Sequence, residues 1–550
     1  MGLFLKKSIA ELQIEANEQG EGSFKRIFGA WRLIALGIGA VIGAGLFSIT
    51  GYAAANYAGP AIGLSFIVAG IGCCFAGLCY AEFASMIPVA GSAYTYSYAT
   101  MGEFIAWIIG WDLILEYAVT AATVSISWSK YLVHFLEGLG IDLPLALTSC
   151  PWDGGIVNIP AALIIVAVSF LLIRGTSESA TMNNVIVVLK VIIVLSFIFL
   201  GWKYIRSENF VPYIPPNTGT FGEYGFSGII RAAAVVFFAY VGFDAVSTAA
   251  QETKNPSRNM PIGILGSLLV CTVLYIAFSH VMLGTTRYEF FKGHDGIAPV
   301  ALAIDHMEDL GPDGVFIPAY PWLGKAIVLA ILAGYTSVIL VMLLGQSRVF
   351  YSMSKDGLLP ETFAKIHPKF RTPYKSNLLF MVTVSVFVLF VPARVAGELT
   401  SIGTLFAFIL VSIGVLVLRR QMPEVKRTFR TPWVPFVPLA GIVTCLFMML
   451  YLPPETWTRL IIWMLLGMDA YYLYGSNHSR LRNGEPLSDK DRRFIARVTV
   501  ILAALLIAVT ACFYTTDANK VSFYLSLIFS LVHIFAYKSK LFVCLCQEKM

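Results

Sequence analysis

Apolar runs of about twenty residues, separated by short polar segments, recur along the whole 550-residue chain. A helix needs a run of this length to cross about 30 Å of hydrocarbon. The pattern therefore predicts an all-α integral membrane protein with fourteen spans. Their ranges are 30–57, 61–87, 93–129, 156–173, 183–204, 227–250, 262–285, 322–350, 377–391, 398–418, 433–452, 456–475, 497–515 and 521–537.

The first span has an unusual glycine content. Within Leu36–Gly51 the glycines are Gly37, Gly39, Gly43, Gly45 and Gly51. Each glycine in a helix interior costs about 1 kcal/mol relative to alanine. Backbone that is not helical persists at membrane depth only where it is buried in protein or lines a cavity. We therefore predict that the helix breaks at Gly43-Ala44-Gly45 and that the freed amides and carbonyls face a ligand.

The sixth span has a second candidate break at Ala239–Gly242, followed by Asp244. Spans 1 and 6 are the first members of two five-span halves. Interrupted helices at matching positions of two halves point to a transporter binding site near the midplane. Amides at the start of a half-helix suit a carboxylate, and carbonyls at the end of the other suit an ammonium group. The alternative is that these small residues serve only close helix packing.

Composition and charge support the membrane assignment. The chain is 57% apolar and only 13% charged, whereas soluble proteins contain about 25% charged residues. With the N-terminus inside, 28 of the 39 Lys and Arg residues fall on the inner side and 9 on the outer side. This bias predicts cytoplasmic termini and a multi-pass protein of the cell membrane, plasma or inner. The net charge of +6 is thus explained by topology and indicates no nucleic-acid partner.

No sequence feature indicates an enzyme. The loops are too short to fold as a catalytic domain, and no P-loop, HExxH or GxSxG pattern occurs in a suitable setting. The nine cysteines lie mostly in apolar runs and predict neither a disulfide framework nor a metal site. We expect no cofactor. The oligomeric state is not readable from the sequence.

Four segments of the chain form extended motifs: GIGAVIGAGLF in the first span, 79–117, 236–264 and 343–360. Together they resemble the cationic amino acid transporter branch of the amino acid–polyamine–organocation superfamily. The resemblance covers about residues 24–475. It implies a leucine-transporter-type fold of two inverted five-helix repeats with about four additional C-terminal helices. The expected parts are a cytoplasmic segment 1–26, repeats 27–204 and 227–418, spans 11–12 in 433–475, and accessory spans 13–14 in 497–537.

The resemblance also implies a site for an α-amino acid. The α-carboxylate is expected at Gly43, Ala44 and Gly45, and the α-amino group at the carbonyls of Val41, Ile42, Phe238, Ala239 and Val241. Many relatives have Thr or Ser where this chain has Ala44, so a hydroxyl contact is missing here.

Lys190 lies within the fifth span, about two turns from its cytoplasmic end. A lysine there either extends its ammonium group to the headgroups or has a function inside the protein. The resemblance implies the second role, with the ammonium in the place of a sodium ion between spans 1, 5 and 8. Thr336 and Ser337 of span 8 fall where sodium-coupled relatives place hydroxyl ligands. Loss of a proton from Lys190 would then couple transport to protons.

Glu116 and Asp244 are the other ionisable candidates. Glu116 lies four residues after Asp112 and so on the same helix face. We expect Glu116 to contact a cationic substrate side chain or to bind a proton. Asp244 either caps the second half-helix or contacts the substrate.

The sequence thus favours a secondary active permease, with proton-coupled uptake of cationic or neutral L-amino acids by alternating access. An exchanger on the same fold and a receptor that binds an amino acid without moving it are the alternatives. The expected partners are an amino acid, protons and the lipid bilayer.

Overall fold

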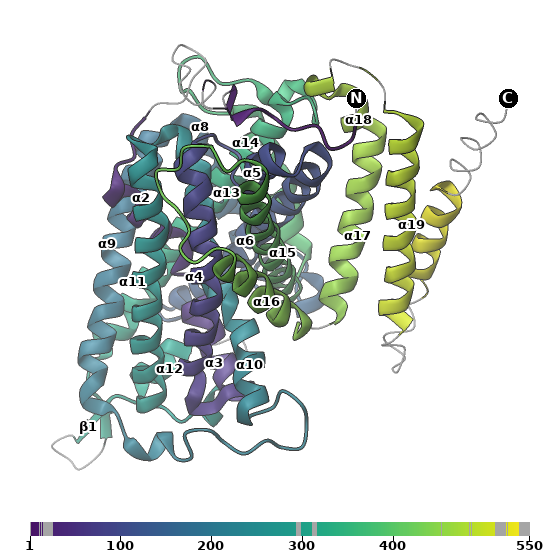
Figure 1. Cartoon of the computed structure of the whole chain (residues 1–550). Helices are drawn as coiled ribbons and strands as arrows, with labels where there is room; N and C mark the ends of the chain where they lie inside the picture. Colours follow the sequence, from purple (N-terminus) through teal and green to yellow (C-terminus); the bar gives the residue numbers. More distant parts are fainter. Residues whose placement is uncertain are drawn as a thin grey trace.

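The structure is a computed structural model of the chain, a bundle of mostly upright helices (Figure 1). It describes residues 2–9, 11–12, 14, 26–43, 45–292, 299–310, 316–452, 454–482, 485, 487–511, 524 and 526–537. In the labels that follow, α denotes an α-helix and η a 3-10 or π-helical segment.

The elements up to residue 210 are α2 (Ala30–Val41), η1 (Gly45–Ile49), α3 (Thr50–Ala53), η2 (Ala54–Ala58), η3 (Gly59–Ala61), α4 (Ile62–Met86), α5 (Ala93–Thr100), α6 (Glu103–Glu137), α7 (Leu145–Thr148), η4 (Pro151–Asp153), α8 (Ile159–Arg174), α9 (Thr176–Gly201), η5 (Trp202–Tyr204) and η6 (Ser207–Phe210). The next are α10 (Gly225–Val236), η7 (Phe237–Tyr240), η8 (Asp244–Glu252), α11 (Pro256–Thr285), η9 (Tyr288–Phe291), α12 (Pro299–Asp305), β1 (Glu308–Leu310), β2 (Phe316–Pro318), α13 (Pro321–Lys355), η10 (Glu361–Ala364), α14 (Tyr374–Phe390) and α15 (Ala393–Gln421). The last are α16 (Phe436–Leu450), α17 (Pro454–Ala470), η11 (Tyr471–Gly475), α18 (Ser476–His478), η12 (Arg480–Arg482), α19 (Asp489–Ala511) and a helix over Ser526–Tyr537.

The all-α membrane architecture is confirmed. Within the described residues, eight helical stretches are long and apolar enough to cross a membrane, or nine if the bent pair α16–α17 counts as one. Three further apolar helices, α8, α14 and Ser526–Tyr537, are shorter. The stretch Ala30–Met86 contains two of the predicted spans. The number of fourteen spans and the side on which the termini lie stay predictions.

The predicted third span, 93–129, is divided into two helices. α5 ends at Thr100 and the much longer α6 begins at Glu103. Gly102 between them has φ +95°, a conformation that favours glycine. A Cβ at Gly102 would lie 2.5 Å from the Phe4 carbonyl oxygen, because the N-terminal segment crosses the chain at this point.

The two broken helices run antiparallel to each other. The residues before α2 pair with the end of η8, since the amide of Ile27 donates to the Glu252 carbonyl at 2.8 Å. At the opposite end, the residue before α10 pairs with the end of η2, where the Tyr224 amide donates to the Tyr57 carbonyl at 2.8 Å. Each broken helix therefore begins where the other ends, as expected for the first helices of two inverted repeats.

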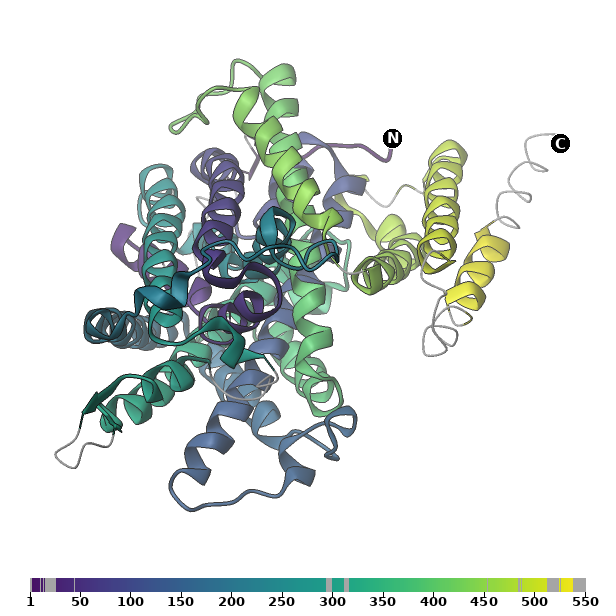
Figure 2. The same cartoon turned by 90° about the horizontal axis from the view of Figure 1, so that it is seen from below.

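The last helices lie at one side of the bundle (Figure 2). α17 is attached to α6 through stacked indoles of Trp111 and Trp463, whose centroids are 4.6 Å apart and whose Nε1 atoms each donate to the other residue's carbonyl. α19 packs on the other side of α17 through a small separate cluster. Its buried residues are Ile461, Leu465, Ala503 and Leu506.

Candidate functional site

The predicted break in the first span is present. α2 ends at Val41, and Ile42 is extended with φ −76° and ψ 101°. The helix resumes at Gly45 as the π-helical η1, in which the wider turn changes the register of the backbone hydrogen bonds. Ala44 lies outside the described residues.

The second break lies in the predicted stretch of the sixth span. α10 ends at Val236 and is followed by the 3-10 segment η7. The backbone is then extended at Val241, with ψ 131°. Gly242 follows with φ +110°, which requires glycine, and η8 begins at Asp244. The chain therefore has two interrupted helices, one in each half.

The two breaks are in direct contact. A Cβ on Gly45 would lie 2.2 Å from the Ala239 Cα, and a Cβ on Gly242 would lie 2.9 Å from the Ala40 Cβ. Such an approach is possible only without the side chains, so glycine here serves backbone-to-backbone packing as well as the break itself. The same glycines therefore allow the two helices to pack closely and interrupt them, which frees backbone groups for a ligand.

One tyrosine connects the breaks. The Tyr275 hydroxyl of α11 lies 2.8 Å from the Val41 carbonyl oxygen and 2.8 Å from the Ala239 carbonyl oxygen. A hydroxyl has one proton, so it donates to one carbonyl at a time, and each oxygen has a second lone pair. Sequence reasoning missed Tyr275, because one tyrosine in an apolar helix carries no sign of its partners.

The other carbonyls expected to bind an α-amino group are engaged differently. The Phe238 carbonyl accepts from the Val241 amide at 3.2 Å, and the Ile42 carbonyl accepts from Lys190. Phe238 and Val241 are both buried. Of the predicted set, the carbonyls of Val41 and Ala239 are the pair that converges on one point.

Lys190 on α9 turns inward rather than toward the headgroups. Its side chain is fully buried, and Nζ donates to the carbonyls of Gly39 and Ile42, each at 2.9 Å. No carboxylate within ion-pair distance of it is found among the described residues. Its partners are thus backbone carbonyls at the broken end of α2, a position that leaves the ammonium charge without a counterion.

Of the two hydroxyls predicted near Lys190, the structure brings Ser337 there and not Thr336. Ser337 Oγ on α13 lies 3.2 Å from the same Gly39 carbonyl oxygen and 2.5 Å from Asn183 Oδ1. Thr336 donates to the Leu332 carbonyl of its own helix at 2.8 Å. Asn183, on α9, was not anticipated from the sequence.

Three buried carboxyl groups lie on the side of the site toward α6. Asp112, Glu116 and Asp244 are fully buried, and Asp244 accepts a hydrogen bond from the Tyr117 hydroxyl at 2.7 Å. Both oxygens of Asp112 and of Glu116, and one of Asp244, have no hydrogen-bond partner among the described residues. A buried carboxylate without a partner is costly, which makes these groups candidates to bind a proton or a cation. No group of three or more potential ligands close enough to hold a metal ion is found in the described part of the chain.

A buried ion pair lies beyond the breaks, at the end of the bundle predicted to be cytoplasmic. Arg348 of α13 donates through Nε to Glu252 Oε1 at 2.7 Å, and both side chains are 1% exposed. Glu252 ends η8, and its carbonyl also accepts from the amides of Ile27 and Phe28 before α2. The pair therefore holds both broken helices to α13. Sequence reasoning did not identify it, although both residues lie in motifs that carry the family resemblance.

Comparison with known proteins identifies the family. The amino acid permease family model matches residues 28–468. The chain is 45% identical over 483 residues to the branched-chain amino acid permease BcaP of Bacillus subtilis (strain 168), and 43% identical over 481 residues to the methylthioribose transporter of the same organism. Each alignment covers 87% of this chain and 99% of the relative. It is also 34% identical over 424 residues to cationic amino acid transporter 4, vacuolar, of Arabidopsis thaliana, covering 77% of this chain and 68% of that protein.

The chain therefore belongs to the amino acid permease family of the amino acid–polyamine–organocation superfamily, as its motifs indicated. It is a transporter rather than an enzyme, and a multi-pass protein of the cell membrane.

The glycines at the first break allow a graded test. We expect Gly45→Ala to abolish transport and lower the melting temperature, because the new methyl group meets the Ala239 backbone, which cannot move alone. Gly43→Ala should cost less, since its Cβ would lie 2.7 Å from Val338 Cγ2, a side chain. Thermal unfolding and uptake of labelled amino acid measure both effects.

Two variants complete this series. Gly43→Ala combined with Val338→Ala should regain activity to within about threefold, because the second change removes the clash. Gly324→Ala, where a Cβ would meet nothing within 4 Å, is the matched control. Wild-type transport by Gly45→Ala would contradict the contact between the breaks.

Proposed function

We propose that this permease is a secondary transporter that takes up L-amino acids together with protons by alternating access. The observation that carries the proposal is the pair of touching helix breaks, where Tyr275 binds the carbonyls of Val41 and Ala239. Bare backbone groups from two antiparallel half-helices present amides to one end of a zwitterion and carbonyls to the other.

In this mechanism the α-carboxylate binds the amides that follow the first break, at Gly43, Ala44 and Gly45. The α-amino group binds the carbonyls of Val41 and Ala239, sharing them with the Tyr275 hydroxyl. An ammonium group has three protons to donate, so it can bond to both carbonyls, to which the Tyr275 hydroxyl offers only one proton. Every zwitterionic amino acid has these two groups, so backbone capture sets the class of substrate and leaves its side chain free.

Two substrate classes have support of different kinds. By their names, one Bacillus subtilis relative is a branched-chain amino acid permease, the Arabidopsis relative is a cationic amino acid transporter, and the other Bacillus subtilis relative carries methylthioribose. In this chain, the unpaired carboxyl oxygens of Glu116 and Asp244 favour a cationic side chain or a proton. We therefore propose neutral and cationic L-amino acids as substrates.

Lys190 is proposed as the proton-coupling residue. As an ammonium it holds the carbonyls of Gly39 and Ile42, and so fixes the end of α2 against α9. Burial without a counterion disfavours the charged form of a lysine. Loss of the proton weakens both contacts, which lets α2 move relative to α9 and α13. Protonation would thus be coupled to the closing of the site.

Flux measurements test the function itself. Purified protein in liposomes should accumulate labelled leucine or arginine when an inward proton gradient is imposed, and accumulation should fall to the equilibrium level when the gradient is collapsed. Uptake that requires internal amino acid instead of the gradient would establish an exchanger. Binding without flux would establish a receptor, and either result would overturn the proposal.

Substitution of Lys190 tests the coupling. We expect Lys190→Met to keep amino acid binding within about threefold and to abolish gradient-driven accumulation, because the titrating group is gone. Lys325→Met, at an exposed site on α13, is the control and should accumulate normally. Unchanged accumulation by Lys190→Met would remove this residue from the mechanism.

Loss of the Glu252–Arg348 pair should open the site at one end. Removing one partner of a buried ion pair costs about 3–5 kcal/mol, so Arg348→Met should raise hydrogen exchange at the amides of Ile27, Phe28 and Lys254 at least tenfold. The exposed pair Arg480–Glu361 provides the control Arg480→Met, with no change at these amides. Unaltered exchange in Arg348→Met would show that the pair does not hold the broken helices.

A further inference from the structure

A group of unpaired basic side chains surrounds the connection between α15 and α16. Arg420 lies in the last turn of α15, and Lys426 and Arg430 lie in the loop that follows. All three are exposed. None of them has an ion-pair or hydrogen-bond partner in the part of the chain that the structure describes. They lie at the end of the bundle that the charge bias predicts to be cytoplasmic.

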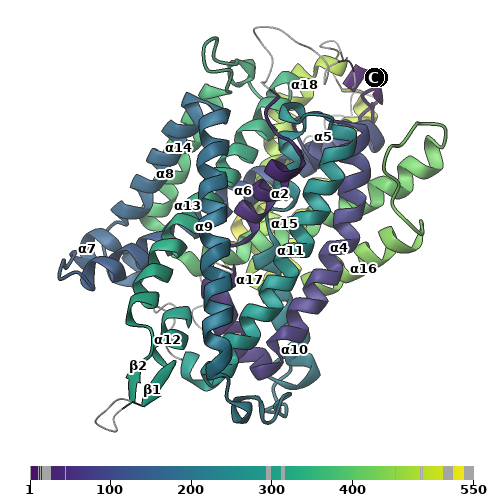
Figure 3. The same cartoon turned by 90° about the vertical axis from the view of Figure 1, so that its left-hand side faces the viewer.

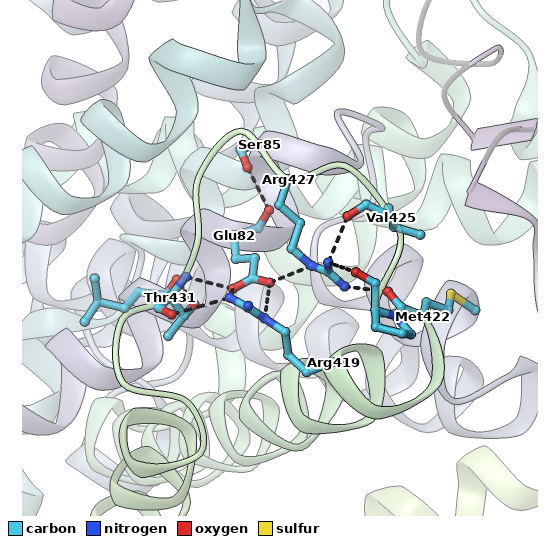
Figure 4. A network of polar contacts seen from close by, with 9 residues as sticks. Glu82, Ser85, Arg419, Met422, Val425, Arg427 and Thr431 are labelled. Carbon is cyan, nitrogen blue, oxygen red and sulfur yellow. Dashed lines mark hydrogen bonds and ion pairs between the residues drawn. The ribbon is translucent and has the colours of Figure 1, made fainter.

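The loop that carries these cations is held in one conformation. The Glu82 carboxylate of α4 accepts from Arg419 at 3.0 and 2.9 Å, lies 3.2 Å from Arg427 Nε, and accepts from the Thr431 amide at 2.8 Å (Figure 4). Arg427 in turn donates to the carbonyls of Met422, Pro423 and Val425. The fully buried Glu82 thus fixes both ends of the loop, and the three exposed cations are presented from an ordered backbone.

The loop has an excess of positive charge. The end of α15 and the loop together have the basic residues Arg419, Arg420, Lys426, Arg427 and Arg430, against the acidic residues Glu82 of α4 beneath the loop and Glu424 within it. Burial lowers the pKa of Arg427; Glu82 opposes this shift, while the neighbouring cations Arg419 and Arg430 add to it. Positive charge thus exceeds negative charge along this loop and the end of α15, so an added anion would be stabilised there.

An apolar surface continues from the loop along α16. Trp433 is 79% exposed and Phe436 is 61% exposed, directly after the cations. Leu439 and Val443 continue the exposed face at positions three and seven residues after Phe436. α16 lies at the outer edge of the bundle (Figure 3). Tryptophan next to basic residues at the end of a lipid-facing helix is typical of the headgroup region of a bilayer.

We propose that Arg420, Lys426 and Arg430 bind the phosphate headgroup of one anionic phospholipid of the cytoplasmic leaflet, with an acyl chain against Trp433 and the outer face of α16. Charge complementarity selects the headgroup, and the exposed aromatic and aliphatic side chains below it select a lipid over a free phosphate. The lipid would thereby connect the loop, which Glu82 holds to α15 and α4, with the outer face of α16. The proposal does not depend on which substrate is transported.

The test compares lipid binding by the purified full chain and two triple variants, using native mass spectrometry with phosphatidylglycerol and phosphatidylcholine. Wild type should retain phosphatidylglycerol more tightly than phosphatidylcholine. Arg420→Gln/Lys426→Gln/Arg430→Gln should bind phosphatidylglycerol at least tenfold more weakly and leave phosphatidylcholine unchanged. The matched control is Lys365→Gln/Lys369→Gln/Lys490→Gln, which removes three exposed charges elsewhere and should behave as wild type.

Three outcomes would overturn the site. An equal loss of phosphatidylglycerol binding in both triple variants would show that the total surface charge, and not this loop, attracts the lipid. Equal retention of the two lipids by wild type would show no headgroup selection. Displacement of the lipid by glycerol phosphate at the same concentration would show an anion site without a lipid. Unchanged melting temperatures of both triples without lipid confirm that each variant is folded.

Discussion

The constraint on which the structure depends is that backbone freed inside a membrane needs hydrogen-bond partners. α2 and α10 both stop within the bilayer-spanning bundle, and water is not available there as it is around a soluble loop. The partners come from neighbouring helices: Lys190 from α9, Tyr275 from α11 and Ser337 from α13. Each interrupted helix is thus attached to neighbouring helices, whose side chains supply the hydrogen bonds that the broken turn lacks.

The same partners hold the broken ends by individual hydrogen bonds, which can be exchanged for other partners. The Tyr275 hydroxyl lies between the carbonyls of Val41 and Ala239, one on each broken helix. In the proposed mechanism the amino group of the substrate binds the same two carbonyls, so occupancy of the site and the position of the half-helices are linked.

Three buried ion pairs lie toward the end of the bundle predicted to be cytoplasmic. Glu252–Arg348, Glu82–Arg419 and Glu103–Arg482 are carboxylate–guanidinium pairs with at least one partner almost fully buried. They differ in what they connect. The first joins the broken helices to α13, whereas the second joins α4 to the α15–α16 loop. The same chemistry therefore holds the broken helices in one place and fixes a loop in the other.

The sequence by itself determined the class of fold, the positions of both breaks and Lys190 as a candidate, but it left open whether Lys190 faces inward or reaches the headgroups, which the structure decided. Glycines in a helix and a lysine inside an apolar run both cost free energy in hydrocarbon, so they mark candidate positions that can be recognised from the local sequence. It did not reveal Tyr275, Asn183 or the Glu252–Arg348 pair, nor that Ser337 rather than Thr336 turns toward Lys190. It also merged α5 and α6 into one span, since the need for Gly102 arises from the distant Phe4 backbone. These features depend on which helix faces which, and only tertiary packing brings residues far apart in the chain within hydrogen-bond distance.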